Sequence, residues 1–279
     1  MSPAEASAPG QLAVGHECPI CASAGLVLRF RWSEPPEGET PFELPEGVAY
    51  EREFLQCGAC GHLVAGASID PELIYGGAYV DATYSRGIAA AYERIMALPP
   101  ASSDNIARVE RVCEQLDPPA GEPRTLLDVG SGLGVFGARM KERGWEVTAL
   151  DPDPRAVEHA EQRIGVRGVV ADFMAVEALG EFRLLTLNKV LEHVADPLQM
   201  LRRTRMHLAG DGRVYVEVPD GEVAAERGGE GREELFVEHL HAFSAASLAL
   251  LARRAGFELE GLERLHEPSD KYTLAAFLR

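Results

Sequence analysis

The pattern of apolar and polar residues along the second half of the chain is typical of an α/β fold. Short apolar runs have the length of buried strands, and stretches with helical spacing of apolar residues separate them. The runs lie at 125–129, 146–150, 166–170, 182–187 and 213–218, with helical patterns over 135–143, 154–163 and up to 208. Such alternation predicts a parallel sheet covered by helices. A further helix over 245–255 and two strands over 257–265 and 272–278 are expected to close the domain.

The first of these strands leads into a glycine-rich loop. Gly130, Gly132 and Gly134 stand at every second position between the strand and its helix. Glycine has no Cβ, so the backbone can turn sharply there and a ligand can lie against it. The second strand ends in Asp151, followed by Pro152, and an acid at this place can bind both hydroxyls of a ribose.

The loop by itself fits more than one cofactor. Residues 132–137 match the dinucleotide pattern GxGxxG, which is weak in isolation, and a turn that only connects two elements is a further reading. Asp128 ends the strand just before the loop, where a carboxylate would repel a pyrophosphate and suit an ammonium group. This favours a cofactor with an amine and no phosphate over a nicotinamide or flavin.

Two further strand ends carry polar residues. Asp172 and Phe173 follow the third strand, where an acid can bond an adenine amino group and an aromatic ring can cover its face. A plain acidic turn is the alternative. Asn188 ends the fourth strand.

Two CxxC pairs near the N-terminus predict a metal site. Cys18 with Cys21 and Cys57 with Cys60 have the spacing within each pair that is typical of zinc ribbons. Four thiolates leave no position for water, so the zinc is expected to be structural. Disulfides are the alternative, as is replacement of one thiolate by His62 or His16. The fifth cysteine, Cys113, lies in a helical pattern and is expected to be a buried apolar residue.

The stretch between the cysteines and the α/β region reads as helical, with an aromatic, glycine-containing segment over 75–85. Its tyrosines, Tyr79 and Tyr84, are candidates for a lid over the cofactor or for a cover of the zinc module. The stretch Ser102–Asp104 is expected to cap a helix whose apolar face ends near Leu116.

Composition limits the partners. The chain has 279 residues and a formal net charge of −17, which argues against a nucleic-acid backbone or an anionic membrane. No segment is long and apolar enough to span a bilayer. The first residues lack the pattern of a signal peptide, so a cytoplasmic protein is expected. The predicted domains are a disordered leader (1–15), a zinc-binding module (16–66), a helical lid and linker (67–120) and an α/β domain (121–279), in a monomer or homodimer.

Taken together, the motifs at 128–134, 188–194 and 253–257 resemble those of class I S-adenosylmethionine (SAM) methyltransferases. The resemblance covers about the last 160 residues. It implies a seven-stranded Rossmann-like sheet with an antiparallel last hairpin. It also places Gly130, Ser131, Gly132 and Gly134 against the methionine portion of SAM. Asp151 would hold the ribose, Asp172 and Phe173 the adenine, and Asn188 would lie beside the methyl group.

A narrower resemblance covers the front of the chain as well. Two cysteine pairs, a tyrosine-containing lid and the stretch Glu238–Ser244 look like the sugar C-methyltransferases of deoxysugar biosynthesis. In those enzymes the equivalent histidine is the candidate base, with a neighbouring glutamate and a lid tyrosine. This implies catalytic roles for His239, Glu238 and Tyr79 or Tyr84. The sugar enzymes continue into a further domain, whereas this chain ends after the sheet, so methylation of oxygen or nitrogen is as well supported as methylation of carbon.

Histidine chemistry fits a methyl transfer even without the family resemblance. The acceptor must be held near the methyl carbon and often loses a proton, for which histidine has a suitable pKa. His239 and His241 follow the fifth strand and lie two residues apart, so an extended chain would point both to one side. His193 is a weaker candidate.

The predicted function is therefore methyl transfer from SAM to a small molecule such as a sugar or secondary metabolite. A zinc-ribbon enzyme that methylates RNA or protein is the alternative, and a binding protein without activity is a third reading. The acidic composition counts against RNA.

Overall fold

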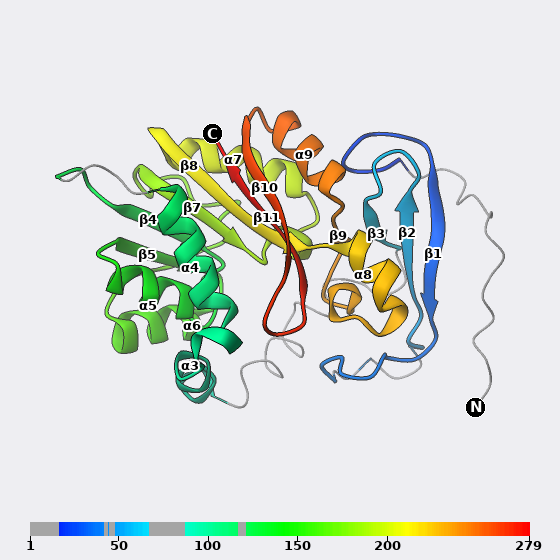
Figure 1. Cartoon of the computed structure of the whole chain (residues 1–279), viewed down its shortest axis with the longest axis horizontal. Helices are drawn as coiled ribbons and strands as arrows, with labels where there is room; N and C mark the ends of the chain where they lie inside the picture. The colour runs from blue at the N-terminus through cyan, green and yellow to red at the C-terminus, as the bar shows by residue number, and fades with distance from the viewer. Residues whose placement is uncertain (1–16, 42–43, 45–47, 67–86, 117–120) are drawn as a thin grey trace.

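The computed structural model describes residues 17–41, 44, 48–66, 87–116 and 121–279. Their strands form two sheets, one of four strands and one of seven (Figure 1). The predicted leader, Tyr79, Tyr84 and the parts of the predicted lid and linker at 67–86 and 117–120 lie outside the described residues. Within the described ranges, no helix has the length and apolar character needed to cross a membrane.

The large sheet and its helices account for most of the described chain. Its strands are β4 (Thr125–Val129), β5 (Glu146–Asp151), β6 (Arg167–Val170), β7 (Phe182–Asn188), β8 (Leu208–Pro219), β10 (Leu259–His266) and β11 (Tyr272–Leu278). The helices are α3 (Ile88–Met96), α4 (Asp104–Gln115), α5 (Val135–Glu142), α6 (Pro154–His159), α7 (Pro197–Thr204), α8 (Gly221–Arg227) and α9 (Ala245–Arg254). Within the predicted cap at 102–104, Ser103 is the residue that caps α4, since its hydroxyl accepts a hydrogen bond from the Ile106 amide.

The strand order confirms the predicted fold class. The order is β10-β11-β8-β7-β4-β5-β6, with β4 to β8 parallel and β11 antiparallel to both β8 and β10. The chain enters at β4, runs outward to β6 and then returns to β7 on the other side of β4. In such a sheet, ligands bind outside the carboxyl ends of the two strands where the direction reverses, here β4 and β7.

Helices cover both faces of this sheet (Figure 1). Successive residues of a strand point to opposite faces, so Leu126 packs with α4 and α5 while Leu127 packs with α7 and α9. Both leucines are fully buried. The core is therefore two apolar layers, one on each side of the sheet, which fix the carboxyl ends of its strands.

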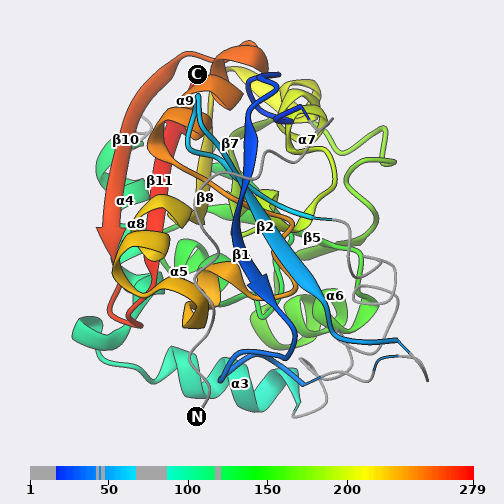
Figure 2. The ribbon, with the colours of Figure 1, turned by 90° about the vertical axis from the view of Figure 1, so that its right-hand side faces the viewer.

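The small sheet combines three strands from the front of the chain with one strand from a much later segment. Its strands are β1 (Leu26–Trp32), β2 (Arg52–Cys57), β3 (Leu63–Ala65) and β9 (His241–Ala242), in that order. The last strand comes from the segment between α8 and α9 and pairs antiparallel with β3. In the side view of Figure 2, β1 and β2 lie in front of the large sheet.

Packing also joins the two sheets. Ile20 and Leu55, from the cysteine-containing part, belong to the same buried cluster as Phe243 and Leu248. The Ser244 hydroxyl, which also caps α9, donates a hydrogen bond to the Cys60 carbonyl. A continuous apolar core therefore links the cysteine-containing part to the large sheet.

Candidate functional site

The glycine loop between β4 and α5 has the backbone that its sequence predicts. Gly130, Gly132 and Gly134 have φ values of 68°, 52° and 71°, which side chains disfavour. The amides of Gly130 and Ser131 donate to the Leu150 carbonyl at the end of β5, at 2.8 and 3.2 Å. A Cβ on Gly130 would lie 2.8 Å from the Val190 side chain. The loop is thus held tightly between the ends of β5 and β7.

Asp151 is fixed at the end of β5 by backbone amides. One carboxylate oxygen accepts from the Gly132 amide and the other from the Asp153 amide, each at 2.9 Å. Burial raises the pKa of Asp151, and these two bonds oppose that rise. A carboxylate offers about four acceptor positions. Each oxygen therefore keeps capacity for a further donor such as a ligand hydroxyl.

Asp128 and Asn188 connect the two strands at the reversal point. The Asp128 carboxylate accepts from the Thr186 hydroxyl at 2.7 Å and from the Asn188 amide group at 3.3 Å, both on the same oxygen. Asp128 is 3% exposed, and burial raises its pKa to about 6. This acid therefore changes its charge just below neutral pH.

Two buried polar atoms beside the loop lack a partner among the described residues. They are the Ser131 hydroxyl and the side-chain carbonyl oxygen of Asn188. Buried polar atoms are rarely left unsatisfied in native proteins. Their position next to Asp128 and the glycines fits a polar ligand bound at this edge of the sheet.

The predicted adenine residues have different surroundings. Asp172 is exposed, and its carboxylate accepts from the Met174 amide at 2.8 Å. Phe173 is 2% exposed and packs in the core near the His207 ring, so it offers little surface to a ligand. Pro152 is exposed beside Asp151.

His193 and His239 lie side by side, with ring centroids 4.9 Å apart. His193 Nδ1 lies 2.9 Å from the Glu238 carbonyl oxygen, and His239 Nδ1 lies 2.9 Å from the Glu234 carbonyl oxygen. Because a carbonyl only accepts, each Nδ1 carries the hydrogen and the lone pair of the neutral ring is on Nε2. Burial lowers the pKa of both rings, which keeps them neutral.

His241 meets different partners from His239. It lies in β9, and its Nδ1 is 3.0 Å from Nε2 of His62, which belongs to the turn before β3. Both rings are buried, and burial lowers the pKa of His241 to about 4. His241 thus packs on His62 within the small sheet and also lies beside Val194 and Ala195 after β7, whereas His239 packs on His193.

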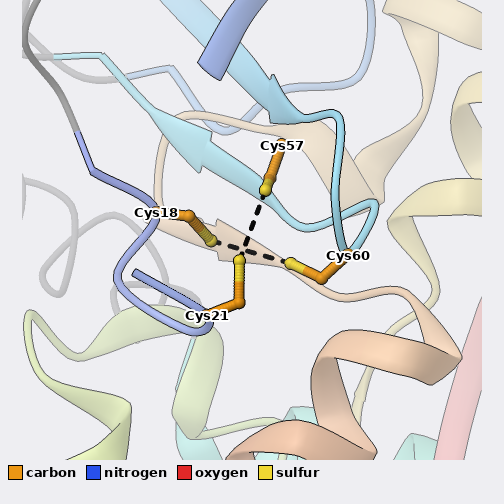
Figure 3. Close-up of side chains that lie close together, drawn as sticks. All are labelled: Cys18, Cys21, Cys57 and Cys60. Carbon is orange, nitrogen blue, oxygen red and sulfur yellow. Dashed lines mark hydrogen bonds between the residues drawn. The ribbon is translucent and has the colours of Figure 1, made fainter. Parts of the chain in front are cut away.

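The four predicted metal ligands come together (Figure 3). The sulfur atoms of Cys18 and Cys60 lie 3.7 Å apart and those of Cys21 and Cys57 lie 3.5 Å apart, and none is in a disulfide. Four sulfurs at about 2.3 Å from a tetrahedral zinc ion would be roughly 3.8 Å from one another. The cluster therefore has the dimensions of a zinc tetrathiolate site without help from His62, and His16 lies outside the described residues.

The small sheet also supports the segment that carries His239. Arg52 in β2 donates to the carbonyls of Leu235 and Phe236. Glu39 accepts from Tyr50, from Arg52 and, at 2.8 Å, from the Val237 amide. Glu39 was not singled out from the sequence, because it lies in a loop whose composition resembles that of any solvated turn.

Glu192 is a second residue of this region that the sequence pattern does not mark as functional. It lies between strand β7 and His193, it is 0% exposed, and both its carboxylate oxygens lack a hydrogen-bond partner among the described residues. Burial raises its pKa to about 7. Its position next to His193 was visible in the motif at 188–194, but its burial was not.

Comparisons with known proteins agree with this fold. A family model described as a methyltransferase domain matches residues 101–262. A ubiquinone biosynthesis O-methyltransferase of Xanthomonas axonopodis pv. citri is 31% identical over 180 residues, which cover 59% of this chain and 74% of that protein. One of the same description from Caulobacter vibrioides is 35% identical over 102 residues, 34% of this chain and 40% of that protein.

Two solved structures are similar in fold. A Burkholderia thailandensis 1,6-didemethyltoxoflavin-N1-methyltransferase, solved with its acceptor and S-adenosylhomocysteine, has a TM-score of 0.56 at 19% identity. The match covers 86% of this chain and 98% of that one. A putative O-methyltransferase of Nostoc punctiforme has a TM-score of 0.52 at 20% identity, over 68% of this chain and 58% of that one.

Proposed function

Because this chain belongs to the methyltransferase domain family, we propose that its carboxyl-edge site transfers a methyl group from SAM to a small-molecule acceptor. Family membership makes it a SAM-dependent methyltransferase. We propose where the cofactor binds, which acceptor is methylated and what single residues do.

The main support for the cofactor placement is Asp151. Its carboxylate accepts a hydrogen bond from the Gly132 amide in the glycine loop. We assign Asp151 to the ribose hydroxyls and Asp128 to the ammonium group of the methionine portion. The unpartnered atoms of Ser131 and Asn188 would find donors or acceptors in the same portion. SAM supplies a methyl carbon activated by a positively charged sulfur. Asp172 is kept for the adenine, whereas the buried Phe173 ring is not needed there.

The acceptor would lie against His193 and His239. Both rings have their lone pairs on Nε2, and carbonyl oxygens hold both rings in place. His239 is the candidate base that removes a proton from the acceptor, and Glu238 holds the neighbouring ring through its carbonyl. His241 contacts His62 instead and is given no catalytic role here.

A small molecule is favoured over a macromolecule as the acceptor. The net charge of −17 opposes binding to RNA, the curated relatives are named for ubiquinone biosynthesis, and one solved neighbour is named for the methylation of 1,6-didemethyltoxoflavin. The relatives in ubiquinone biosynthesis are O-methyltransferases, which favours a hydroxyl acceptor. Transfer to a carbon atom of a sugar is a second candidate within the same activity, methyl transfer from SAM to a small molecule.

Calorimetry and a transfer assay test the function. The protein should bind SAM and S-adenosylhomocysteine in preference to NAD. With radiolabelled SAM, it should label small hydroxyl-containing acceptors but not RNA or protein. Preference for NAD, or labelling of macromolecules alone, would contradict the proposal.

We propose that the four cysteines hold one structural zinc ion. Replacing Cys21 by serine removes one thiolate, so the variant should lose most of its zinc and unfold at a lower temperature than the wild type. Elemental analysis and thermal unfolding measure both effects. Cys113→Ser is the matched control because Cys113 lies in α4, outside the cluster, and it should keep the metal. The zinc site would be ruled out if the wild-type protein contained no zinc and all four cysteines of the cluster titrated as free thiols.

SAM affinity should depend on pH through Asp128. The pKa of this acid is raised to about 6, so its charge is complete above that pH and is lost as the pH falls. Because only the charged form attracts an ammonium group, SAM should bind more weakly as the pH falls from 7 to 5. Asp128→Asn should remove this dependence. 5′-Methylthioadenosine, which lacks the amino-acid portion, should bind with little pH dependence to either protein.

A further inference from the structure

A second cluster of potential metal ligands lies at the carboxyl edge of the large sheet. Glu192, His193 and His239 each offer a ligand atom, and these atoms lie within 4.8 Å of one another. Glu192 and His193 belong to the turn after β7, and His239 belongs to the segment before β9. The Leu240 amide donates to the Glu192 carbonyl at 2.7 Å, which ties the two segments together.

Both histidines are oriented as metal ligands usually are. The Nδ1–H group of each ring donates to a backbone carbonyl, that of Glu238 for His193 and that of Glu234 for His239. This arrangement places the lone pair on Nε2 and fixes the ring, as in most protein metal sites. The two rings come from segments far apart in the sequence, yet their centroids are only 4.9 Å apart.

Glu192 supplies the independent observation. Its side chain is completely buried, and neither carboxylate oxygen has a hydrogen-bond partner among the described residues. A buried carboxylate without partners is costly unless it binds a cation or takes up a proton. The nearby ammonium group of Lys189 donates to the Thr273 hydroxyl at 2.6 Å. A metal ion beside the two imidazoles would satisfy Glu192 directly.

We propose that Glu192, His193 and His239 bind a divalent transition-metal ion, separate from the tetrathiolate site. Two imidazoles and one carboxylate form a ligand set that leaves open positions on the metal. Val190, two residues before Glu192, packs against Gly130 of the glycine loop. The turn that would hold the ion therefore lies against the glycine loop.

The chemical role of this ion rests on the proposed function and names the acceptor class, a hydroxyl compound that binds the metal through oxygen. On the metal, the hydroxyl releases its proton to water more readily. The oxygen then forms a bond to the methyl carbon as the carbon–sulfur bond breaks, and that electron pair stays on sulfur, giving S-adenosylhomocysteine. His239 acts in this scheme as a ligand, which replaces its role as the base.

Metal titration of the full-length protein, with its cysteine site already filled with zinc, tests the inference. Mn²⁺ binding is followed by the electron paramagnetic resonance of free Mn²⁺, and Zn²⁺ binding by calorimetry. One additional ion per chain should bind. Glu192→Gln and His239→Ala should each weaken that binding at least about tenfold. The control is His266→Ala, since His266 is an exposed histidine that pairs with Asp270 and is not part of the cluster, and it should bind as the wild type does.

The outcomes separate this inference from the proposed function. Binding of neither ion by protein that still binds SAM would overturn the metal site and leave the methyltransferase assignment intact. Equal binding by wild type and Glu192→Gln would place any ion elsewhere and also overturn it. Failure to bind SAM would contradict the proposed function alone, because the metal titration does not depend on SAM. Retained SAM affinity in Glu192→Gln shows that this variant is folded.

Discussion

His239→Ala should lower turnover by about 10²–10⁴-fold while SAM affinity stays nearly unchanged. The reason is that His239 would act on the acceptor and not on the cofactor, either by taking its proton or by holding the metal that binds it. The measurement is the rate at saturating SAM together with the dissociation constant for SAM from calorimetry.

The His239 experiment needs two comparisons. His266→Ala should keep full turnover, because His266 is exposed, pairs with Asp270 and is not part of the cluster of Glu192, His193 and His239. His241→Ala should act mainly on stability, since it leaves the buried His62 ring without its partner. Full turnover by His239→Ala with a genuine acceptor would remove both roles assigned to His239.

Asp151→Ala should weaken SAM binding by roughly 10- to 150-fold, the equivalent of about 1.5–3 kcal/mol for one charge-assisted hydrogen bond. The loss has two sources, because the carboxylate would bind the ribose and also accepts from the Gly132 amide of the loop. Asp151→Asn should not restore binding, since its NH₂ group would face a backbone N–H in place of an oxygen.

Calorimetry with SAM measures the Asp151 effect, and Glu146→Gln provides its control. Glu146 lies at the opposite end of the same strand and is exposed, so its neutralisation should leave SAM affinity unchanged. Wild-type affinity in Asp151→Ala would mean that the cofactor lies elsewhere.

The large sheet could be predicted because its signals are local. The apolar runs at Thr125–Val129 and Glu146–Asp151 are buried strands in the structure, and the glycines between them have the positive φ values that the motif requires. Strand ends follow from the same pattern, so Asp128, Asp151 and Asn188 could be placed at one edge before the structure was known.

The arrangement between α8 and α9 could not be predicted in the same way. Strand β9 has only two residues, too few for any periodic pattern, and it exists because it pairs with β3 from the front of the chain. The burial of Glu192 has a similar origin. Its surroundings come from the turn after β7 and from the segment at 234–240, and no local pattern shows that these meet.

The histidines illustrate the difference between a motif and a site. Sequence spacing suggested that His239 and His241 would share a pocket, whereas the structure gives His239 the neighbour His193 and gives His241 the neighbour His62. The deciding contacts come from residues far from 239–241 in the sequence, so spacing alone could not assign them.

The pairing of β3 with β9 also has a consequence for synthesis on the ribosome. β3 ends at Ala65 and β9 begins at His241, so at about 5–20 residues per second the last strand of the small sheet emerges roughly 10–35 seconds after the third. During that interval the nascent chain carries four free thiols, and the edge of β3 is open. Early zinc capture would protect these cysteines from oxidation and the exposed edge from pairing with other chains. Zinc supply during translation should therefore influence how much of the protein folds correctly in the cell.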